Sequence, residues 1–159
     1  MMHRRLLLAM SVLLVSTACG GSSSDNTTTG PTNNNNNSAR SMSAKIDGVA
    51  WTATTVGAGV SNGIAILAAG NGTTTIGLSF VPAVGTQTVT ATGIVIGQLT
   101  IGGQTWQTAG IAGGSGSVTV TTATANHLVG TFSFTAPALT SGATPATRQV
   151  TAGAFDVTF

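Results

Sequence analysis

Few side chains in this sequence could take part in covalent chemistry, and they are widely separated along the chain. The segment Gly59-Val60-Ser61-Asn62-Gly63 matches the Gly-x-Ser-x-Gly pattern that carries the nucleophilic serine of many hydrolases. That pattern works on a turn between a strand and a helix, with an acid and a histidine later in the chain. No helix pattern follows Ser61, so we interpret the segment as a loop. A small hydrolase that uses Ser61 as nucleophile and His127 as base is kept as an alternative.

The other polar residues do not indicate a metal or cofactor site. Zinc sites draw on several clustered ligands, whereas His127 stands apart from the aspartates, and we interpret it as a solvated turn residue. The sole lysine, Lys45, follows Ala44, which excludes a phosphate loop ending in Gly-Lys. Asp47 belongs to a turn and Asp156 alternates onto the solvent face of a strand, so no paired carboxylates are evident. We therefore predict no catalytic residue, no metal and no cofactor.

Trp51 and Trp106 are the side chains best suited to noncovalent binding. Exposed tryptophan rings stack on sugars and other flat apolar faces, and they are common anchors of interfaces. The alternative is that each ring fills the core, which is favoured in a chain with only two Trp and five Phe. Trp51 and Trp106 are thus candidates for a ligand or partner surface, with burial in the core as the competing interpretation.

The first 19 residues have the organisation of an export signal. Arg4 and Arg5 precede an apolar run, Leu6 to Val15, whose ten residues are too few for a helix to cross a ~30 Å hydrocarbon core. A positive flank, a short apolar run and small residues together describe a secretory signal. Ser16-Thr17-Ala18-Cys19 then stands where an ordinary signal has an Ala-x-Ala-like cleavage site.

The segment from Ser16 to Cys19 resembles the lipobox of bacterial lipoproteins, although Ser16 replaces the usual leucine. The resemblance implies that residues 1–18 are removed and that the Cys19 thiol and the new N-terminus are acylated, for example with palmitate. One acyl chain binds a membrane reversibly, at about 0.8 kcal/mol per buried CH₂, so two or three chains make a stable anchor. The lipobox resemblance also implies a location in the cell envelope. In such lipoproteins an aspartate after the cysteine retains the protein on the inner membrane, so Gly20 at that position favours the outer membrane.

Residues 19–42 are predicted to form a linker after the lipidated cysteine. Gly, Ser, Thr and a run of Asn from Asn33 to Asn37 dominate this stretch. Such a composition cannot bury apolar surface, so we expect disorder. The linker would hold the following domain away from the lipid surface. Because Cys19 is the only cysteine in the chain, disulfides are excluded and the domain depends on its core.

From Cys19 onward the chain carries no net charge. Three basic residues balance three acidic ones: Arg40, Lys45 and Arg148 against Asp25, Asp47 and Asp156. Nucleic-acid binding needs clustered Lys and Arg for phosphate contacts, so nucleic acid is excluded as a partner. The predicted partners are membrane lipid, through acylated Cys19, and a glycan or an envelope protein.

Residues 43–159 are predicted to form a single all-β domain. Thr, Val, Ile and Gly recur in short alternating runs, which is the pattern of strands, and helix signals are absent. Asp47-Gly48 and Asn71-Gly72 are typical hairpin turns. About 8–10 short strands with frequent turns indicate an antiparallel β-sandwich or a flattened β-barrel. An integral outer-membrane β-barrel is a further alternative because Phe155, Val157 and Phe159 align on the last strand, but the strands are short for that.

Two longer patterns concern the domain as a whole. Ile46-Asp47-Gly48-x-x-Trp51 recurs as Ile101-Gly102-Gly103-x-x-Trp106, which indicates either two similar half-domains or coincidence. Together with Gly116–Thr121, Gly130–Phe134 and Gly153–Val157, the segment from Ala44 to Trp51 resembles a family of small bacterial lipoprotein β domains of unknown function. That resemblance implies the fold and brings no catalytic residues.

Overall fold

The computed structural model describes residues 40–90, 92–110, 112–139 and 141–159. These residues form eleven β-strands and contain no helix, and so no helix that could span a membrane. The first strand begins at Ser41, two residues before the predicted start of the domain. Cys19, the predicted signal of residues 1–18 and the predicted linker up to residue 39 lie outside the described residues.

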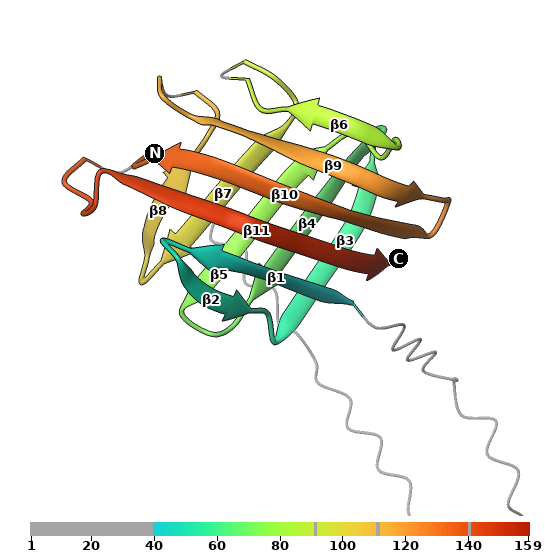
Figure 1. Ribbon diagram of the computed structural model, residues 1–159, viewed down its shortest axis with the longest axis horizontal. Coiled ribbons are helices and arrows are strands. Elements are labelled where there is room, and N and C mark those ends of the chain that lie inside the picture. Colours follow the sequence, from blue (N-terminus) through green and yellow to red (C-terminus); the bar gives the residue numbers. More distant parts are fainter. Residues whose placement is uncertain (1–39, 91, 111, 140) are drawn as a thin grey trace, which may run out of the picture. The chain divides into compact units, whose positions relative to one another are not determined.

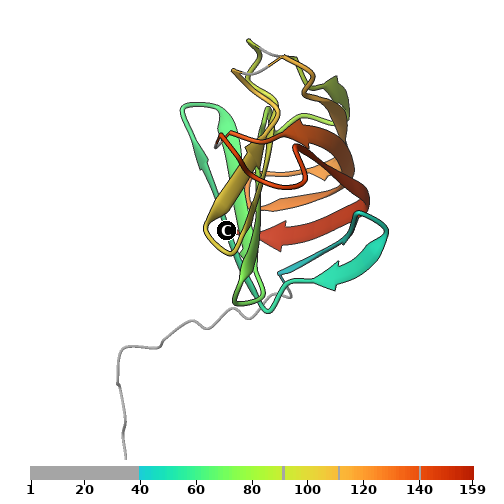
Figure 2. The ribbon, with the colours of Figure 1, turned by 90° about the vertical axis from the view of Figure 1, so that its left-hand side faces the viewer.

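The strands form two antiparallel sheets that face each other (Figures 1 and 2). The six-stranded sheet has the order β2-β1-β11-β10-β9-β6. Its strands are β1 (Ser41–Ile46), β2 (Val49–Thr52), β6 (Gly85–Thr88), β9 (Ser115–Ala123), β10 (His127–Pro137) and β11 (Thr147–Thr158). The five-stranded sheet has the order β3-β4-β5-β7-β8. Its strands are β3 (Thr55–Ser61), β4 (Ile64–Gly70), β5 (Thr74–Phe80), β7 (Ile96–Ile101) and β8 (Gln104–Gln107).

The architecture is a β-sandwich, which confirms one of the two predicted all-β alternatives. The described strands make two separate sheets and are not closed into a barrel, so the flattened barrel is wrong. The closed barrel that the outer-membrane alternative requires is likewise not formed by these strands. Figure 1 shows the strands of one sheet running obliquely across those of the other.

Two-residue turns connect several neighbouring strands. Asp47-Gly48 joins β1 to β2 with φ angles of 49° and 85°, and Gly102-Gly103 joins β7 to β8 with 55° and 82°. Asn62-Gly63 joins β3 to β4 with 52° and 76°. Positive φ at both central residues matches the right-handed twist of paired strands, and Asn, Asp and Gly adopt it most readily. These residue pairs therefore fix the hairpins locally.

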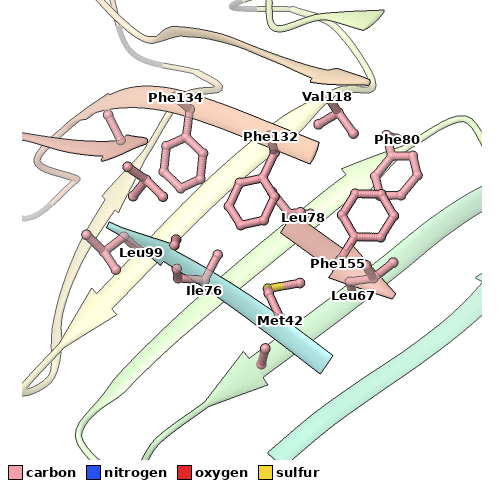
Figure 3. Close-up of a cluster of buried hydrophobic side chains, with 14 of the residues drawn as sticks. Met42, Leu67, Ile76, Leu78, Phe80, Leu99, Val118, Phe132, Phe134 and Phe155 are labelled. Atoms are coloured by element: carbon pink, nitrogen blue, oxygen red, sulfur yellow. The ribbon is translucent and has the colours of Figure 1, made fainter. Parts of the chain in front are cut away.

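The core between the sheets is built around phenylalanine rings (Figure 3). Phe155 on β11 and Phe80 on β5 pack with ring centroids 5.4 Å apart, so this pair bridges the two sheets. Phe132 on β10 lies 6.4 Å from Phe155 and 6.3 Å from Phe134. All four rings are buried. Alternation along each strand sends these side chains to the inner face.

Three glycines make room for these rings. A Cβ atom at Gly97 or Gly153 would lie 2.6 Å from the ring of Phe134 or Phe132, respectively. A Cβ atom at Gly130 would likewise lie 2.5 Å from the ring of Phe155. Each glycine therefore lets an aromatic ring of a neighbouring or facing strand approach the backbone closely.

Candidate ligand-binding site

Ser61 and His127 do not form the contact that the hydrolase alternative requires. Ser61 ends β3 at an exposed β-hairpin and is followed by strand β4, so the strand-to-helix turn of a nucleophile elbow is not formed. His127 begins β10 in the other sheet, where its Nε2 lies 2.7 Å from Asp156 Oδ1. Strand alternation places this His–Asp pair on the outer face of the six-stranded sheet. Among the described residues, no hydrogen bond joins Ser61 to His127 or Asp156.

Neither tryptophan offers an exposed face for stacking, so the burial of Trp51 and Trp106 favours the competing interpretation that each ring fills the core. Trp51 on β2 is 6% exposed and Trp106 on β8 is 1% exposed. Alternation along these short strands turns both rings toward the opposite sheet. Trp106 also donates its Nε1–H to the carbonyl oxygen of Pro145 at 2.8 Å. Both rings belong to the core.

The two copies of the repeated hairpin meet at one cleft. Ile46 of the first copy and Ile101 of the second both line a cavity of about 270 Å³ at one end of the sandwich. Its walls also include Val49, Trp51, Asp47 and Arg148. We call this cavity the Arg148 cleft. It lies between the sheets, because β1, β2 and β11 supply one wall and Ile101 on β7 belongs to the other.

The Arg148 cleft is the place where the apolar interior opens to solvent. Val49 lies two residues before buried Trp51 on β2, so both side chains project from the inner face. Val49 is nevertheless 71% exposed. On the opposite wall, Ile101 is half-buried, although Leu99 two residues earlier is fully buried. An apolar inner surface without cover is a common setting for ligand binding.

Arg148 is held in one position at this opening. Its Nη1 donates to Asp47 Oδ2 at 2.5 Å, and its guanidinium carbon lies 4.9 Å from the centre of the Trp106 ring. This distance is within the range of a cation–π contact. The first copy of the repeat thus supplies the anion for Arg148 and the second supplies the aromatic face.

Asp47 is ionised at neutral pH. Partial burial raises its pKa, but the N–H of Gln149, which donates to Oδ1 at 2.9 Å, and the Arg148 guanidinium together lower the pKa below its usual value. The carboxylate therefore remains available to pair with Arg148. Asp47 also starts the β1–β2 turn, so the same residue fixes the hairpin and the cation.

The region from residue 37 to 157 matches the family model described as a domain of unknown function, DUF6252. The chain belongs to the DUF6252 family. Comparisons with curated proteins and with solved structures found no match. The matched region contains the Arg148 cleft and extends from before β1 into β11, whereas Cys19 lies outside it. Membership in the DUF6252 family confirms the expected relation to a family of unknown function.

Arg148 is a residue of the candidate site of this DUF6252 chain that no sequence motif indicates. It is the one formally charged residue between Asp47 and Asp156. A single cation within a long uncharged stretch needs a partner when the chain folds, because a charge near the core is costly unless paired. That isolation is the signal that could have identified it. The exposed position of Val49 had no comparable signal in the sequence.

A second hollow of the DUF6252 domain lies on the outer face of the five-stranded sheet. Gly77 on β5 leaves a depression of about 280 Å³ that is bordered by Ile66, Ile96 and Gln98. Ile66 is 53% exposed. All residues from 48 to 147 lack formal charge, so this sheet is entirely uncharged. The hollow has no polar group as firmly positioned as Arg148, and the cleft is therefore the better candidate.

Proposed function

We propose that this protein is an exported lipoprotein, anchored in the membrane by lipid on Cys19, whose β-sandwich is a non-enzymatic binding domain. The observation that carries the binding role is the Arg148 cleft, where uncovered inner-face residues surround a fixed cation. Ligand pockets are mostly apolar with a few positioned polar groups, and the cleft has this composition. We propose no chemical step; in support, His127 pairs with Asp156, and no hydrogen bond joins Ser61 to either side chain among the described residues.

The size of the cleft limits what it can hold. Pockets for complete drug-sized ligands measure about 300–1,000 Å³. A cavity of about 270 Å³ suits a small molecule or one group of a larger partner. In the cell envelope, and on the outer membrane as Gly20 favours, that partner would be a glycan or an envelope protein. The lipid anchor would keep the cleft near such partners.

The anchor is tested by labelling with radioactive palmitate in a bacterial host that processes lipoproteins. We expect label on the wild-type chain and none on Cys19→Ala, because the thiol is the acceptor of the diacylglyceryl group. Ser16→Leu is the matched control, since it restores the usual lipobox residue and should keep the label. Equal labelling of Cys19→Ala and the wild type would show that lipid is attached elsewhere.

The cleft is tested by titrating 1-hexanol into the full chain carrying Cys19→Ala, so that no attached lipid competes for the alcohol. We expect the methyl NMR signals of Val49 and Ile101 to shift with saturation, while Val60, on the β3–β4 hairpin, stays unchanged. Val49→Trp should abolish the shift of Ile101 by filling the cleft, and its exposed position should let the variant fold. Similar shifts at Val60 and Val49, or binding that survives Val49→Trp, would reject the cleft as the site.

A further inference from the structure

Strand β3 has the longest free edge of the sandwich. It stands at the end of the five-stranded sheet and has seven residues, whereas the other edge strands, β2, β6 and β8, have four each. The edge of β8 is also partly covered, because the Leu139 N–H donates to the Thr105 carbonyl oxygen at 2.8 Å. Natural proteins protect edge strands with bulges, proline or lysine, and β3 has none of these along its regular pairing with β4. The edge of β3 is therefore open to a further strand.

Three residues of β3 direct their backbone groups toward this edge. Ser61 and Ile64 flank the two-residue turn and face each other, so they form a hydrogen-bonded pair of the β3–β4 hairpin. Hydrogen-bonded and non-hydrogen-bonded positions alternate along an antiparallel strand, so Val60, Ala58 and Val56 point their N–H and C=O groups away from β4. Within the part of the chain that the structure describes, these three residues make no backbone hydrogen bond outside the hairpin. Each offers one donor and one acceptor to a strand laid alongside.

The same three residues carry apolar side chains at the open side of the core. Val60 lies opposite buried Ala65, so its side chain projects from the inner face, yet it is 44% exposed. Val56 and Ala58 share this face and are half-buried against the core. A strand added beside β3 would place every second side chain next to these residues and so extend the core.

The surroundings of the edge favour a single strand over a second copy of the domain. Figure 1 shows the end of β11 and the start of β10, both in the facing sheet, extending beyond β3. Two copies joined through β3 by a twofold axis across the joint sheet would have both six-stranded sheets on the same side, where these ends would meet. One added strand brings no second sheet with it. It would give each layer of the sandwich six strands.

The chemistry of the edge determines what the added strand carries. All strands of this sheet lack formal charge, and a charged side chain turned toward the core would be costly without a partner. Successive side chains of a strand point to opposite faces, so alternate residues of the added strand must be apolar. The linker of this chain does not qualify, because residues 20–38 contain only Gly, Ser, Thr, Asn, Asp and Pro.

We propose that β3 binds an extended segment of another protein by strand addition, and that this segment carries uncharged apolar residues at alternate positions. The backbone groups of Val56, Ala58 and Val60 provide the affinity, and their apolar side chains select the facing residues. The site is separate from the Arg148 cleft and does not depend on it.

The test uses the peptide Ile-Ala-Ile-Leu-Ala-Ala-Gly, which has the sequence of β4, with lysines added beyond both ends for solubility. β4 is the antiparallel partner of β3 in the fold, so this peptide has the required apolar alternation. We expect it to shift the amide NMR signals of Val56, Ala58 and Val60 in the full chain carrying Cys19→Ala, and to slow their hydrogen exchange. The amide signals of β2 and β6 should stay unchanged.

The control peptide has the same side chains but is N-methylated at the second, fourth and sixth residues of the β4 sequence, which would donate toward β3. A net hydrogen bond corresponds to roughly a three- to tenfold change in affinity. Loss of three donors should therefore weaken binding at least tenfold. Equal affinities of the two peptides would overturn the inference, as would the absence of any shift at Val56, Ala58 and Val60.

A proline in β3 tests the same contact from the side of the protein. Ala58→Pro removes one outward N–H and leaves the bonds to β4 in place, because edge strands tolerate proline where the N–H faces solvent. We expect it to weaken binding of the unmodified peptide at least threefold. Ala50→Pro is the matched control, since Ala50 has the equivalent outward position on edge strand β2 and should leave the affinity unchanged. If Ala58→Pro fails to fold, the comparison of the two peptides on the unsubstituted strand still decides the question.

Sedimentation equilibrium without peptide identifies the occupant. A monomer agrees with the single-strand assignment, whereas a dimer that Ala58→Pro dissociates would show that the edge holds a second copy and would overturn it. The Arg148 cleft is read out separately by 1-hexanol at Val49 and Ile101. Failure of the strand-addition site therefore leaves the cleft standing, and failure of the cleft leaves the strand-addition site standing.

Discussion

Replacing Gly130 with alanine is expected to destabilise the sandwich by more than about 3 kcal/mol, at the upper end of what overpacking a core costs. A Cβ atom at this position would lie 2.5 Å from Phe155 Cζ and closer still to the backbone oxygen of Thr119. The Thr119 oxygen belongs to neighbouring strand β9, so it cannot withdraw without disturbing the pairing of β9 with β10. Domains of this size are stable by about 5–15 kcal/mol, so a loss of this size is a large fraction of the free energy of unfolding.

Urea unfolding of the two purified chains measures this loss, since the midpoint and slope give the free energy of unfolding. Gly77→Ala is the matched control. Gly77 also lies in a strand, but the nearest atom to its added Cβ, Gln98 Cβ, is at an ordinary 3.6 Å. Because alanine restricts the unfolded chain, this variant should be unchanged or up to about 1 kcal/mol more stable. Equal urea midpoints for Gly130→Ala and Gly77→Ala would show that the close approach at Gly130 is absent in solution.

The local features of the fold could be predicted from the sequence because they depend on neighbouring residues. The turn at Asp47-Gly48 is set by residues that accept positive φ, and the prediction there is confirmed. The alternation that aligns Phe132 with Phe134 also places both rings in the core as expected. Strand period and turn chemistry are short-range properties, so a single sequence carries them.

Strand β3 is not predicted, because its own residues give only a weak local strand signal. Gly57 and Gly59 weaken the strand pattern between Thr55 and Ser61, so the sequence predicts a loop for the Gly-x-Ser-x-Gly segment. In the structure β3 is an edge strand that pairs with β4 along its whole length. Pairing with a partner outweighs the poor intrinsic preference of glycine for strands. The structure therefore has eleven strands where about 8–10 were predicted.

The candidate site could not be predicted because its residues meet only through the order of the strands. Alternation says which side chains share a face of one strand, but not which strands become neighbours or which sheet lies opposite. Asp47 and Arg148 are brought together by the pairing of β1 with β11. Ile46 and Ile101 meet across the two sheets. The repeat identified both hairpins, whereas their common cleft follows from the topology alone.

Phe155→Ala is expected to lower the free energy of unfolding by about 3–5 kcal/mol, as for other buried phenylalanines. Phe155 is 2% exposed and joins the sheets through its contact with Phe80, so its loss opens a cavity at their interface. Phe159→Ala provides the control at the half-buried end of the chain and should cost clearly less. Urea unfolding compares the two variants, and equal losses would mean that the Phe155 ring does not bridge the sheets.

The contact between Phe155 and Phe80 can be isolated by a double-mutant cycle. Aromatic pairs add about 0.5–1.5 kcal/mol beyond the area that they bury. Phe155→Ala and Phe80→Leu should therefore be non-additive by about that amount. The cycle with Gly130→Ala has a different expectation. Removing the Phe155 ring relieves one clash of the new Cβ but not the clash with Thr119 O, so Phe155→Ala should reduce the penalty of Gly130→Ala only in part. A complete rescue would show that β9 can move away from β10, and that the ring alone determines the need for glycine at this position.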